Sequence, residues 1–245
     1  MEPATLPTLF YGVPQGCSFG SIVALEWLGE PYRLCRIEML EQPWDPLFAR
    51  VNPLMKTPAL LVDGETLSES LSIQLHLAAR GIGRGLGFAQ GTRDYDRLTR
   101  MLGYLNTDFF ASFAPLWLAY ESGALEPQQE QFLRGIGRDE VVRQCAYLDR
   151  LLADRRWLLG ETRSLADAYF SGIGRWVGYM KLFDTQREYP NLHRYLQALG
   201  DDAGVRFARN IEKDPHTARG TAFRGHVTLQ ELEPLLPRIQ RPEAA

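Results

Sequence analysis

The sequence predicts an α/β unit followed by an all-helical domain. Up to about residue 81, short apolar runs with strand character alternate with segments of helical spacing. The glycine-rich stretch GIGRGLGFAQGT then interrupts this pattern, and long amphipathic segments follow it. We therefore expect a first domain over residues 1–81, a helical domain over residues 92–210, and a largely irregular tail over residues 211–245.

The α/β unit contains three predicted strands and two predicted helices. Apolar residues at Phe19, Ile22, Val23 and Trp27 recur at helical spacing, so the first helix should begin at about Ser18. An Asp-Gly pair predicts a turn after the third strand. The other expected elements are strands at Thr8–Tyr11, Tyr32–Met39 and Thr57–Gly64 and a helix at Leu67–Arg80.

The second half of the chain has helical periodicity only. In the tail, which holds four prolines, we expect one short helix near Leu229–Leu236. The helical segments are Arg93–Tyr120, Gln129–Ala153, Leu165–Leu182 and Leu192–Leu199.

Composition and charge exclude several classes of function. A formal net charge of -3 and a pI near 5.9 provide no basic field for nucleic acid or anionic lipid. The first basic residue is Arg33, so we expect no signal peptide, which would need a charged n-region. The uncharged run Phe109–Tyr120 is too short to span a bilayer. Cys17, Cys35 and Cys145 resemble neither a disulfide framework nor a zinc site. We therefore expect a cytoplasmic protein with no nucleic-acid, membrane or metal partner.

Cys17 stands where the first strand gives way to a helix. Unpaired N–H groups and the helix dipole favour negative charge there, which would lower the pKa of the thiol from roughly 8.5. The residue is then a reactive thiol or part of an anion-binding turn. In the alternative interpretation, Cys17 is a small apolar residue and Ser18 is an ordinary N-cap. Local sequence leaves both interpretations open.

Four segments carry a resemblance to a known family: VNPLMKTPALLVDGETLSES, GCSFGSIVALEW, SLADAYFSGIGRW and YLNTDFFASFAPLW. Together they resemble the cytosolic glutathione transferases, most closely the bacterial beta class. In the first of them, Met55 stands where that family usually has Gly, and Thr57 where it usually has Val. The resemblance implies an N-terminal thioredoxin-like domain followed by a C-terminal helical bundle.

The resemblance implies a glutathione site in the first domain. A cis Thr57-Pro58 bond would present the Thr57 backbone to the cysteinyl residue of glutathione. Glu69 and Ser70 would hold the ammonium and carboxylate of the γ-glutamyl group, with Ser70 also able to cap the helix. Lys56 would pair with the glycyl carboxylate. Without the resemblance, each of these residues has an ordinary structural explanation.

The resemblance implies that Cys17 and Ser18 have the catalytic role, beside the glutathione sulfur. For the second substrate we expect an apolar pocket lined by Phe110, Phe113 and Trp176. Phe109 and Trp117 are assigned to packing.

Ser164 and Asp167 have the spacing of a helix capping box. We interpret this pair as a folding device.

The leading functional hypothesis is conjugation of glutathione to small hydrophobic electrophiles by a homodimer, with stabilisation of the glutathione thiolate as the mechanism. One alternative is a glutathione-dependent thiol-disulfide oxidoreductase that uses Cys17. Another is a non-catalytic glutathione-binding or ligand-binding homologue. This last alternative is motivated by Phe110-Ala111, which stands where beta-class members usually carry His-Lys.

Overall fold

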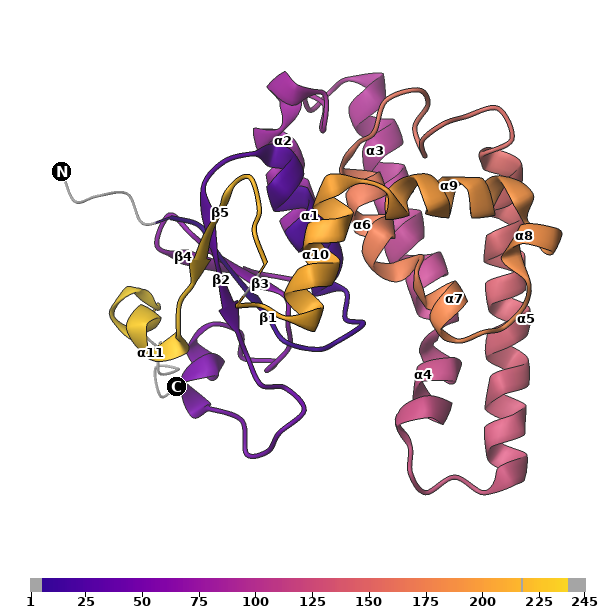
Figure 1. Cartoon of the computed structure of the whole chain (residues 1–245), viewed down its shortest axis with the longest axis horizontal. Helices are drawn as coiled ribbons and strands as arrows, with labels where there is room; N and C mark the ends of the chain where they lie inside the picture. The colour runs from indigo at the N-terminus through magenta and orange to yellow at the C-terminus, as the bar shows by residue number, and fades with distance from the viewer. Residues whose placement is uncertain (1–5, 217, 238–245) are drawn as a thin grey trace, which may run out of the picture.

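The computed structural model describes residues 6–216 and 218–237, and it pairs a mixed sheet with a separate array of helices (Figure 1). The sheet order is β4-β3-β1-β2-β5. β1 is parallel to β2 and antiparallel to β3, which is in turn antiparallel to β4. The first-domain elements are β1 (Thr8–Tyr11), α1 (Ser18–Leu28), β2 (Tyr32–Arg36), β3 (Ala59–Val62), β4 (Glu65–Ser68) and α2 (Ser70–Arg80), with 3-10 turns at Pro46–Arg50 and Ile82–Arg84.

The second domain is helical, as the sequence predicts, and it lies beside the sheet domain (Figure 1). Its long helix α5 runs along the edge farthest from the sheet (Figure 1). The helices are α3 (Arg93–Tyr104), a π-helical segment (Leu105–Phe110), α4 (Ala114–Glu121), α5 (Pro127–Leu151), α6 (Leu165–Ile173), α7 (Trp176–Tyr179), α8 (Thr185–Glu188), α9 (Pro190–Gly200) and α10 (Ala203–Lys213).

Several predicted helices have different bounds in the structure, and the one expected over Leu165–Leu182 is divided into α6 and α7. The helix expected from Leu67 begins at Ser70, because residues 65–68 pair with β3 as strand β4. Asp63 and Gly64 connect these strands with φ values of 51° and 81°, the positive pair that a tight hairpin turn needs. The helix expected to continue through Tyr120 is broken ahead of α4, which has a proline in its first turn.

The tail contributes a strand that the sequence analysis does not predict. Strand β5 (Phe223–His226) pairs in parallel with β2 and forms the fifth strand of the sheet. The short helix expected near Leu229 is present as α11 (Leu229–Leu232), followed by a 3-10 turn, Glu233–Leu235. Residues 223–226 of the tail, which the sequence analysis expected to be largely irregular, therefore form a strand, and residues 238–245 lie outside the described residues.

The carboxylate of Glu26, on α1, anchors the tail. It accepts hydrogen bonds from the backbone N–H groups of Thr221 at 2.7 Å, Phe223 at 3.2 Å and Ala222 at 3.4 Å. It also accepts one from the Tyr32 hydroxyl at 2.9 Å. One side chain thus ties α1, β2 and the start of β5 together.

Helices α1 and α6 join the two domains at a crossing where both present glycine. A Cβ atom on Gly20 would lie 2.8 Å from the Ala168 carbonyl oxygen. A Cβ atom on Gly172 would lie 2.8 Å from the Gly20 nitrogen. Real Cβ atoms do not approach backbone this closely, so the crossing requires glycine on both helices.

The predicted capping box starts α6. The Asp167 carboxylate accepts from the Ser164 N–H at 2.8 Å and from the Leu158 N–H at 2.9 Å. It also accepts a hydrogen bond from the Tyr195 hydroxyl at 2.7 Å, and Asp167 is fully buried. This pair therefore organises the helical domain, which agrees with its interpretation as a folding device.

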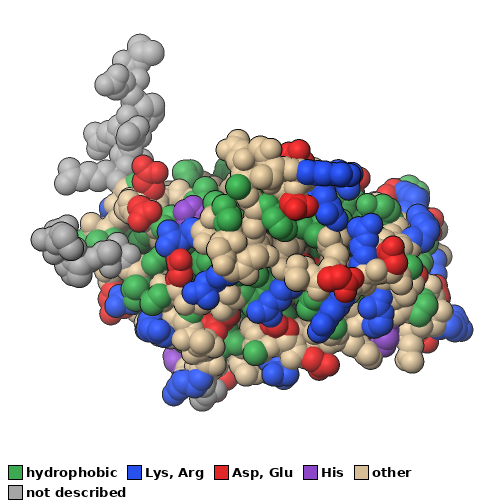
Figure 2. Space-filling model, turned by 90° about the horizontal axis from the view of Figure 1, so that it is seen from above, with side chains coloured by type: hydrophobic (Ala, Val, Ile, Leu, Met, Phe, Trp, Pro, Cys, Tyr) green, Lys and Arg blue, Asp and Glu red, His purple; other side chains and the backbone are tan. Residues whose placement is uncertain are grey.

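Surface charge is mixed in sign over the face shown in Figure 2, where Lys and Arg side chains alternate with Asp and Glu. Among the described helices, none combines the length and hydropathy needed to cross a bilayer.

We expect Glu26→Gln to loosen the tail. The two carboxylate oxygens accept four hydrogen bonds, whereas an amide has only one oxygen to accept them. Hydrogen bonds to a charged group contribute about 1.5–3 kcal/mol each to stability, so the free energy of unfolding should fall by about 2 kcal/mol. Hydrogen exchange at the amides of Thr221 and Phe223 should accelerate. Glu30→Gln, at a surface ion pair with Arg80, is the control. Equal exchange in both variants would contradict the anchoring role.

Candidate functional site

Cys17 lies at the N-terminus of α1, directly after the turn that follows β1. It is the N-cap residue, and α1 begins at Ser18 as predicted. The Cys17 Sγ atom lies 4.0 Å from the Thr57 carbonyl oxygen, within range of a weak S–H hydrogen bond. The thiol therefore faces the loop that leads into β3.

The Thr57-Pro58 peptide bond is cis, as the family resemblance implies. Thr57 is half-buried and Pro58 is buried, immediately before β3. The buried Asn52 side chain shapes the loop ahead of them. Its Nδ2 donates to the Lys56 carbonyl oxygen at 2.8 Å, and its Oδ1 accepts from the Leu54 N–H at 3.1 Å. The sequence analysis did not single out Asn52, although it stands within the quoted VNPLMKTP segment.

Glu69 and Ser70 lie at the start of α2. Glu69 is exposed and has a φ of 69°, a strained conformation for a residue with a side chain. Glu69, and not Ser70, is the N-cap residue, so the expectation that Ser70 caps this helix is wrong. The Ser70 side chain is buried, and its hydroxyl acts to lower the pKa of the Cys17 thiol.

Burial raises the pKa of the Cys17 thiol, and the negative charge of Glu69 adds to this effect. The Ser70 hydroxyl and the positive charge of Arg175 act in the opposite direction, but burial dominates. The lowered pKa expected from the helix N-terminus alone is therefore wrong for this structure. The fully buried Cys35 and Cys145 have pKa values raised to about 12, also by burial.

Ser18 and Lys56 complete the predicted set in the first domain. Ser18 is buried at the first position of α1, next to Cys17. The Lys56 side chain is exposed on the loop before Thr57. The structure thus brings Cys17, Thr57 and Ser70 together, with Ser18 and Lys56 adjacent to them in the chain.

A cluster of aromatic rings from the helical domain adjoins the Cys17 turn. The rings of Phe110, Phe113 and Trp117 all lie edge-on to Trp176, with centroids 5.1, 5.4 and 5.3 Å from it. The Trp176 Nε1 donates to the Gln15 carbonyl oxygen at 2.7 Å. The aromatic cluster is therefore attached directly to the turn that precedes Cys17.

Burial divides the residues predicted for the second-substrate pocket. Phe113 and Trp176 are 0% and 3% exposed, so they support the cluster from within. Phe110 is half-buried and keeps accessible surface. Trp117, which the sequence analysis assigned to packing, is also half-buried, whereas Phe109 is buried as expected.

Two further residues beside the thiol, Arg175 and Tyr169, were not predicted as site residues. The Arg175 Nη2 donates to the Gly16 carbonyl oxygen at 3.2 Å. The Tyr169 hydroxyl donates to the Asn106 Oδ1 at 2.9 Å, and burial raises its pKa. Both lie within the quoted segment SLADAYFSGIGRW, but no spacing signal connects that segment to residue 16 or 17.

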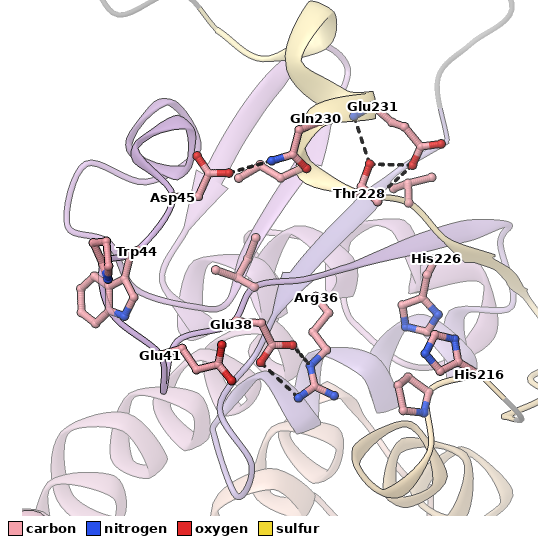
Figure 3. Close-up of a pocket in the computed structure, with 15 residues that line it drawn as sticks. Arg36, Glu38, Glu41, Trp44, Asp45, His216, His226, Thr228, Gln230 and Glu231 are labelled. Atoms are coloured by element: carbon pink, nitrogen blue, oxygen red, sulfur yellow. Dashed lines mark hydrogen bonds and ion pairs between the residues drawn. The ribbon is translucent and has the colours of Figure 1, made fainter.

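A separate cavity of about 560 Å³ lies between the loop after β2 and the tail, and residues from 36–45, 215–216 and 226–231 line it (Figure 3). The ion pair of Arg36 and Glu38, at 2.6 Å, lies along one wall (Figure 3). His226 lies in another wall with its Nε2 2.9 Å from the Tyr11 hydroxyl, whose pKa burial raises to about 12. Within the described part of the chain, no three His, Cys, Asp or Glu side chains are grouped to hold a metal ion.

The mixed sheet, the cis-proline loop beside a helix N-terminus and the attached helical domain define a two-domain protein with a thioredoxin-like first domain. Family models for the glutathione S-transferase N-terminal and C-terminal domains match residues 17–80 and 93–198. These matches cover more than half of the chain, and the chain belongs to the glutathione S-transferase family.

Individual relatives agree with this assignment. A glutathione S-transferase GstA from Escherichia coli O157:H7 is 28% identical over 208 residues, which are 83% of this chain and 98% of that protein. A sphingomonad glutathione S-transferase, solved in complex with glutathione, has a TM-score of 0.73 and 28% identity over 84% of this chain and 99% of its own. A beta-class glutathione S-transferase from Sphingomonas chungbukensis has a TM-score of 0.72 and 27% identity, and the match covers 84% of this chain and 98% of that protein.

We expect iodoacetamide to alkylate Cys17 about tenfold faster than Cys35 or Cys145, because only Cys17 has accessible surface. The pH midpoint should lie above the roughly 8.5 of free cysteine, because burial raises the Cys17 pKa. Peptide mass spectrometry across pH separates the three thiols. Saturating glutathione should slow the Cys17 reaction. Absence of this protection, or a slower reaction at Cys17 than at the other two, would place the thiol outside the site.

Proposed function

We propose that this protein conjugates glutathione to small hydrophobic electrophiles. The observation that carries the proposal is the meeting of Cys17, Thr57 and Ser70 at the N-terminus of α1. The family resemblance implies that the glutathione sulfur lies at Cys17, the cysteinyl backbone at Thr57 and the γ-glutamyl carboxylate at Ser70. The sphingomonad relative, solved with glutathione bound, supports the same ligand.

Glutathione would lie across the loop before β3 and the start of α2. The Thr57 backbone would pair with the cysteinyl residue, as an added strand pairs with a sheet edge. Glu69 is exposed and available to the γ-glutamyl ammonium, and Ser70 offers its N–H and hydroxyl to the γ-glutamyl carboxylate. The exposed Lys56 would pair with the glycyl carboxylate.

Cys17 would act in this reaction as a hydrogen-bond donor. Because burial raises its pKa, the thiol stays protonated near neutral pH and can direct its S–H toward the glutathione sulfur. The Ser18 hydroxyl is the second candidate donor. Either donor, together with the α1 N-terminus, would stabilise the thiolate after its proton leaves to solvent. The sulfur would then form a C–S bond with the electrophile, and any leaving group would depart with its electron pair.

The second substrate would bind against the accessible faces of Phe110 and Trp117, with Phe113 and Trp176 behind them. This arrangement suits apolar and aromatic electrophiles, since position 110 offers a ring and no titratable group.

The proposal includes a detoxifying role in the cytoplasm and a homodimeric state. The three free cysteines fit a reducing compartment. Exposed apolar side chains on α4 and α5 supply surface for a subunit contact, among them Leu118 at 54% and Phe132 at 67% exposure.

The direct test of the function is a panel of electrophiles, peroxides and mixed disulfides assayed with glutathione. The wild-type protein should conjugate an activated aryl halide such as 1-chloro-2,4-dinitrobenzene. Cys17→Ala or Ser18→Ala should lower kcat about tenfold, as expected for loss of one hydrogen bond to the thiolate. A glutathione adduct on Cys17 that dithiothreitol removes, with turnover of mixed disulfides only, would instead establish the oxidoreductase alternative. Tight glutathione binding without any turnover would establish the binding-protein alternative.

We expect Glu69→Gln and Ser70→Ala to weaken glutathione binding by about tenfold each, because both residues face the charged γ-glutamyl end. Isothermal titration calorimetry measures the dissociation constants. Glu65→Gln is the matched control, since Glu65 is an exposed carboxylate at the opposite end of β4 and pairs with Val62 at the hairpin turn. Unchanged affinity in the first two variants would remove these residues from the site.

A further inference from the structure

Arg175 stands at a junction between the Cys17 turn and the helical domain. Its Nε donates to the Gly172 carbonyl oxygen at 2.9 Å, and its Nη2 donates to the Gly16 carbonyl oxygen at 3.2 Å. Its guanidinium also stacks on the Phe19 ring, with Cζ 3.9 Å from the ring centroid. A single side chain therefore contacts the turn before Cys17, the first turn of α1 and the end of α6.

The Glu212 carboxylate, on α10, fixes the orientation of this guanidinium. The two side chains form a bidentate pair, with Nη1 2.6 Å from Oε2 and Nη2 2.8 Å from Oε1. Their side chains are 16% and 17% exposed, so the pair is shielded from solvent. A bidentate, shielded pair holds one geometry in a way that a surface ion pair does not.

The neighbouring residue reinforces the contact with the turn. Trp176 donates to the Gln15 carbonyl oxygen, so Arg175 and Trp176 together hold the two successive carbonyl groups that precede Cys17. Gln15 has a φ of 60°, a conformation that residues with side chains rarely adopt. Contacts from the second domain thus hold the turn that precedes Cys17, including the positive φ of Gln15.

We infer that Arg175, oriented by Glu212, is a positioning residue for the transfer step. It sets the location of the α1 N-terminus, with Cys17 and Ser18, relative to the glutathione sulfur. This inference rests on the proposed function. The hydrogen bonds of Arg175 reach neither Thr57, Glu69 nor Ser70, so its replacement should affect the chemical step much more than glutathione binding.

The other end of α1 offers a matched control. Arg163 pairs with Asp202, the N-cap residue of α10, with Nη1 2.6 Å from Oδ2. Its guanidinium stacks on Trp27 at 4.4 Å, and the Trp27 Nε1 donates to Asp202 at 2.8 Å. This arginine, aromatic and carboxylate set repeats the Arg175, Phe19 and Glu212 arrangement, but it joins α1 to α10 far along the helix from Cys17.

The test compares Arg175→Lys, Glu212→Gln and Arg163→Lys. Lysine keeps the charge of Arg175 but cannot make the bidentate pair and the two carbonyl contacts together. With 1-chloro-2,4-dinitrobenzene, Arg175→Lys should lower kcat about tenfold and Glu212→Gln about threefold, with KM for glutathione within about twofold of wild type. Arg163→Lys should leave both constants unchanged. If Arg175→Lys does not fold, the kcat and KM of Glu212→Gln alone test the positioning role.

Three results would overturn the positioning role. They are an unchanged kcat in both Arg175→Lys and Glu212→Gln, a rise in KM for glutathione without loss of kcat, and an equal loss of kcat in Arg163→Lys.

Failure of the proposed function is recognised separately, as absence of wild-type turnover across the whole panel. In that case the rate at which iodoacetamide alkylates Cys17 tests the positioning role of Arg175. The rate should change at least about threefold in Arg175→Lys and stay constant in Arg163→Lys. Equal rates in wild type and both variants would overturn the inference.

Discussion

The close crossing of α1 and α6 is the constraint on which the site depends. Gly20 and Gly172 let the two helix backbones approach to a distance that any side chain would prevent. The approach brings the end of α6 beside the N-terminus of α1, so that Arg175 and Trp176 reach the carbonyl groups before Cys17. The thiol belongs to the first domain, but the second domain determines its surroundings.

Helix α1 is also held from the side of the tail and of α10. Glu26 ties it to the start of β5, and the two arginine-carboxylate pairs tie it to α10. The matched family models end at residue 198, so β5 lies beyond the segments that they describe. By pairing with β2, β5 covers an edge of the sheet that would otherwise offer unpaired backbone groups to other chains. The tail thereby adds both a stabilising strand and the cavity of Figure 3.

Local sequence signals predicted the features that local physics determines. The start of α1 at Ser18 followed from apolar spacing, and the capping box at Ser164 followed from residue spacing. The cis bond before Pro58 followed from the family resemblance, since sequence alone does not distinguish the isomers. Strand β5 was missed because its four residues, FRGH, lack an alternating apolar pattern and acquire strand geometry by pairing with β2.

Long-range features of the site were beyond sequence reasoning for a different reason. The helix N-terminus predicted a lowered pKa for Cys17, but burial between the domains raises it. Desolvation depends on every element that packs over the thiol, and no short motif records that packing. The contact of Arg175 with the Gly16 carbonyl spans 159 residues and is equally invisible in the sequence. The burial of Phe113 and Trp176 likewise reflects packing among helices and not helical spacing alone.

A crystal structure of the wild-type protein with reduced glutathione tests the central claim most directly. The account predicts the glutathione sulfur at the N-terminus of α1, within hydrogen-bond distance of the Cys17 thiol or the Ser18 hydroxyl. It also predicts that the cysteinyl backbone pairs with Thr57. Glutathione bound away from Cys17, for example in the cavity between the β2 loop and the tail, would contradict the account. A disulfide between glutathione and Cys17 would contradict the donor role assigned to that thiol.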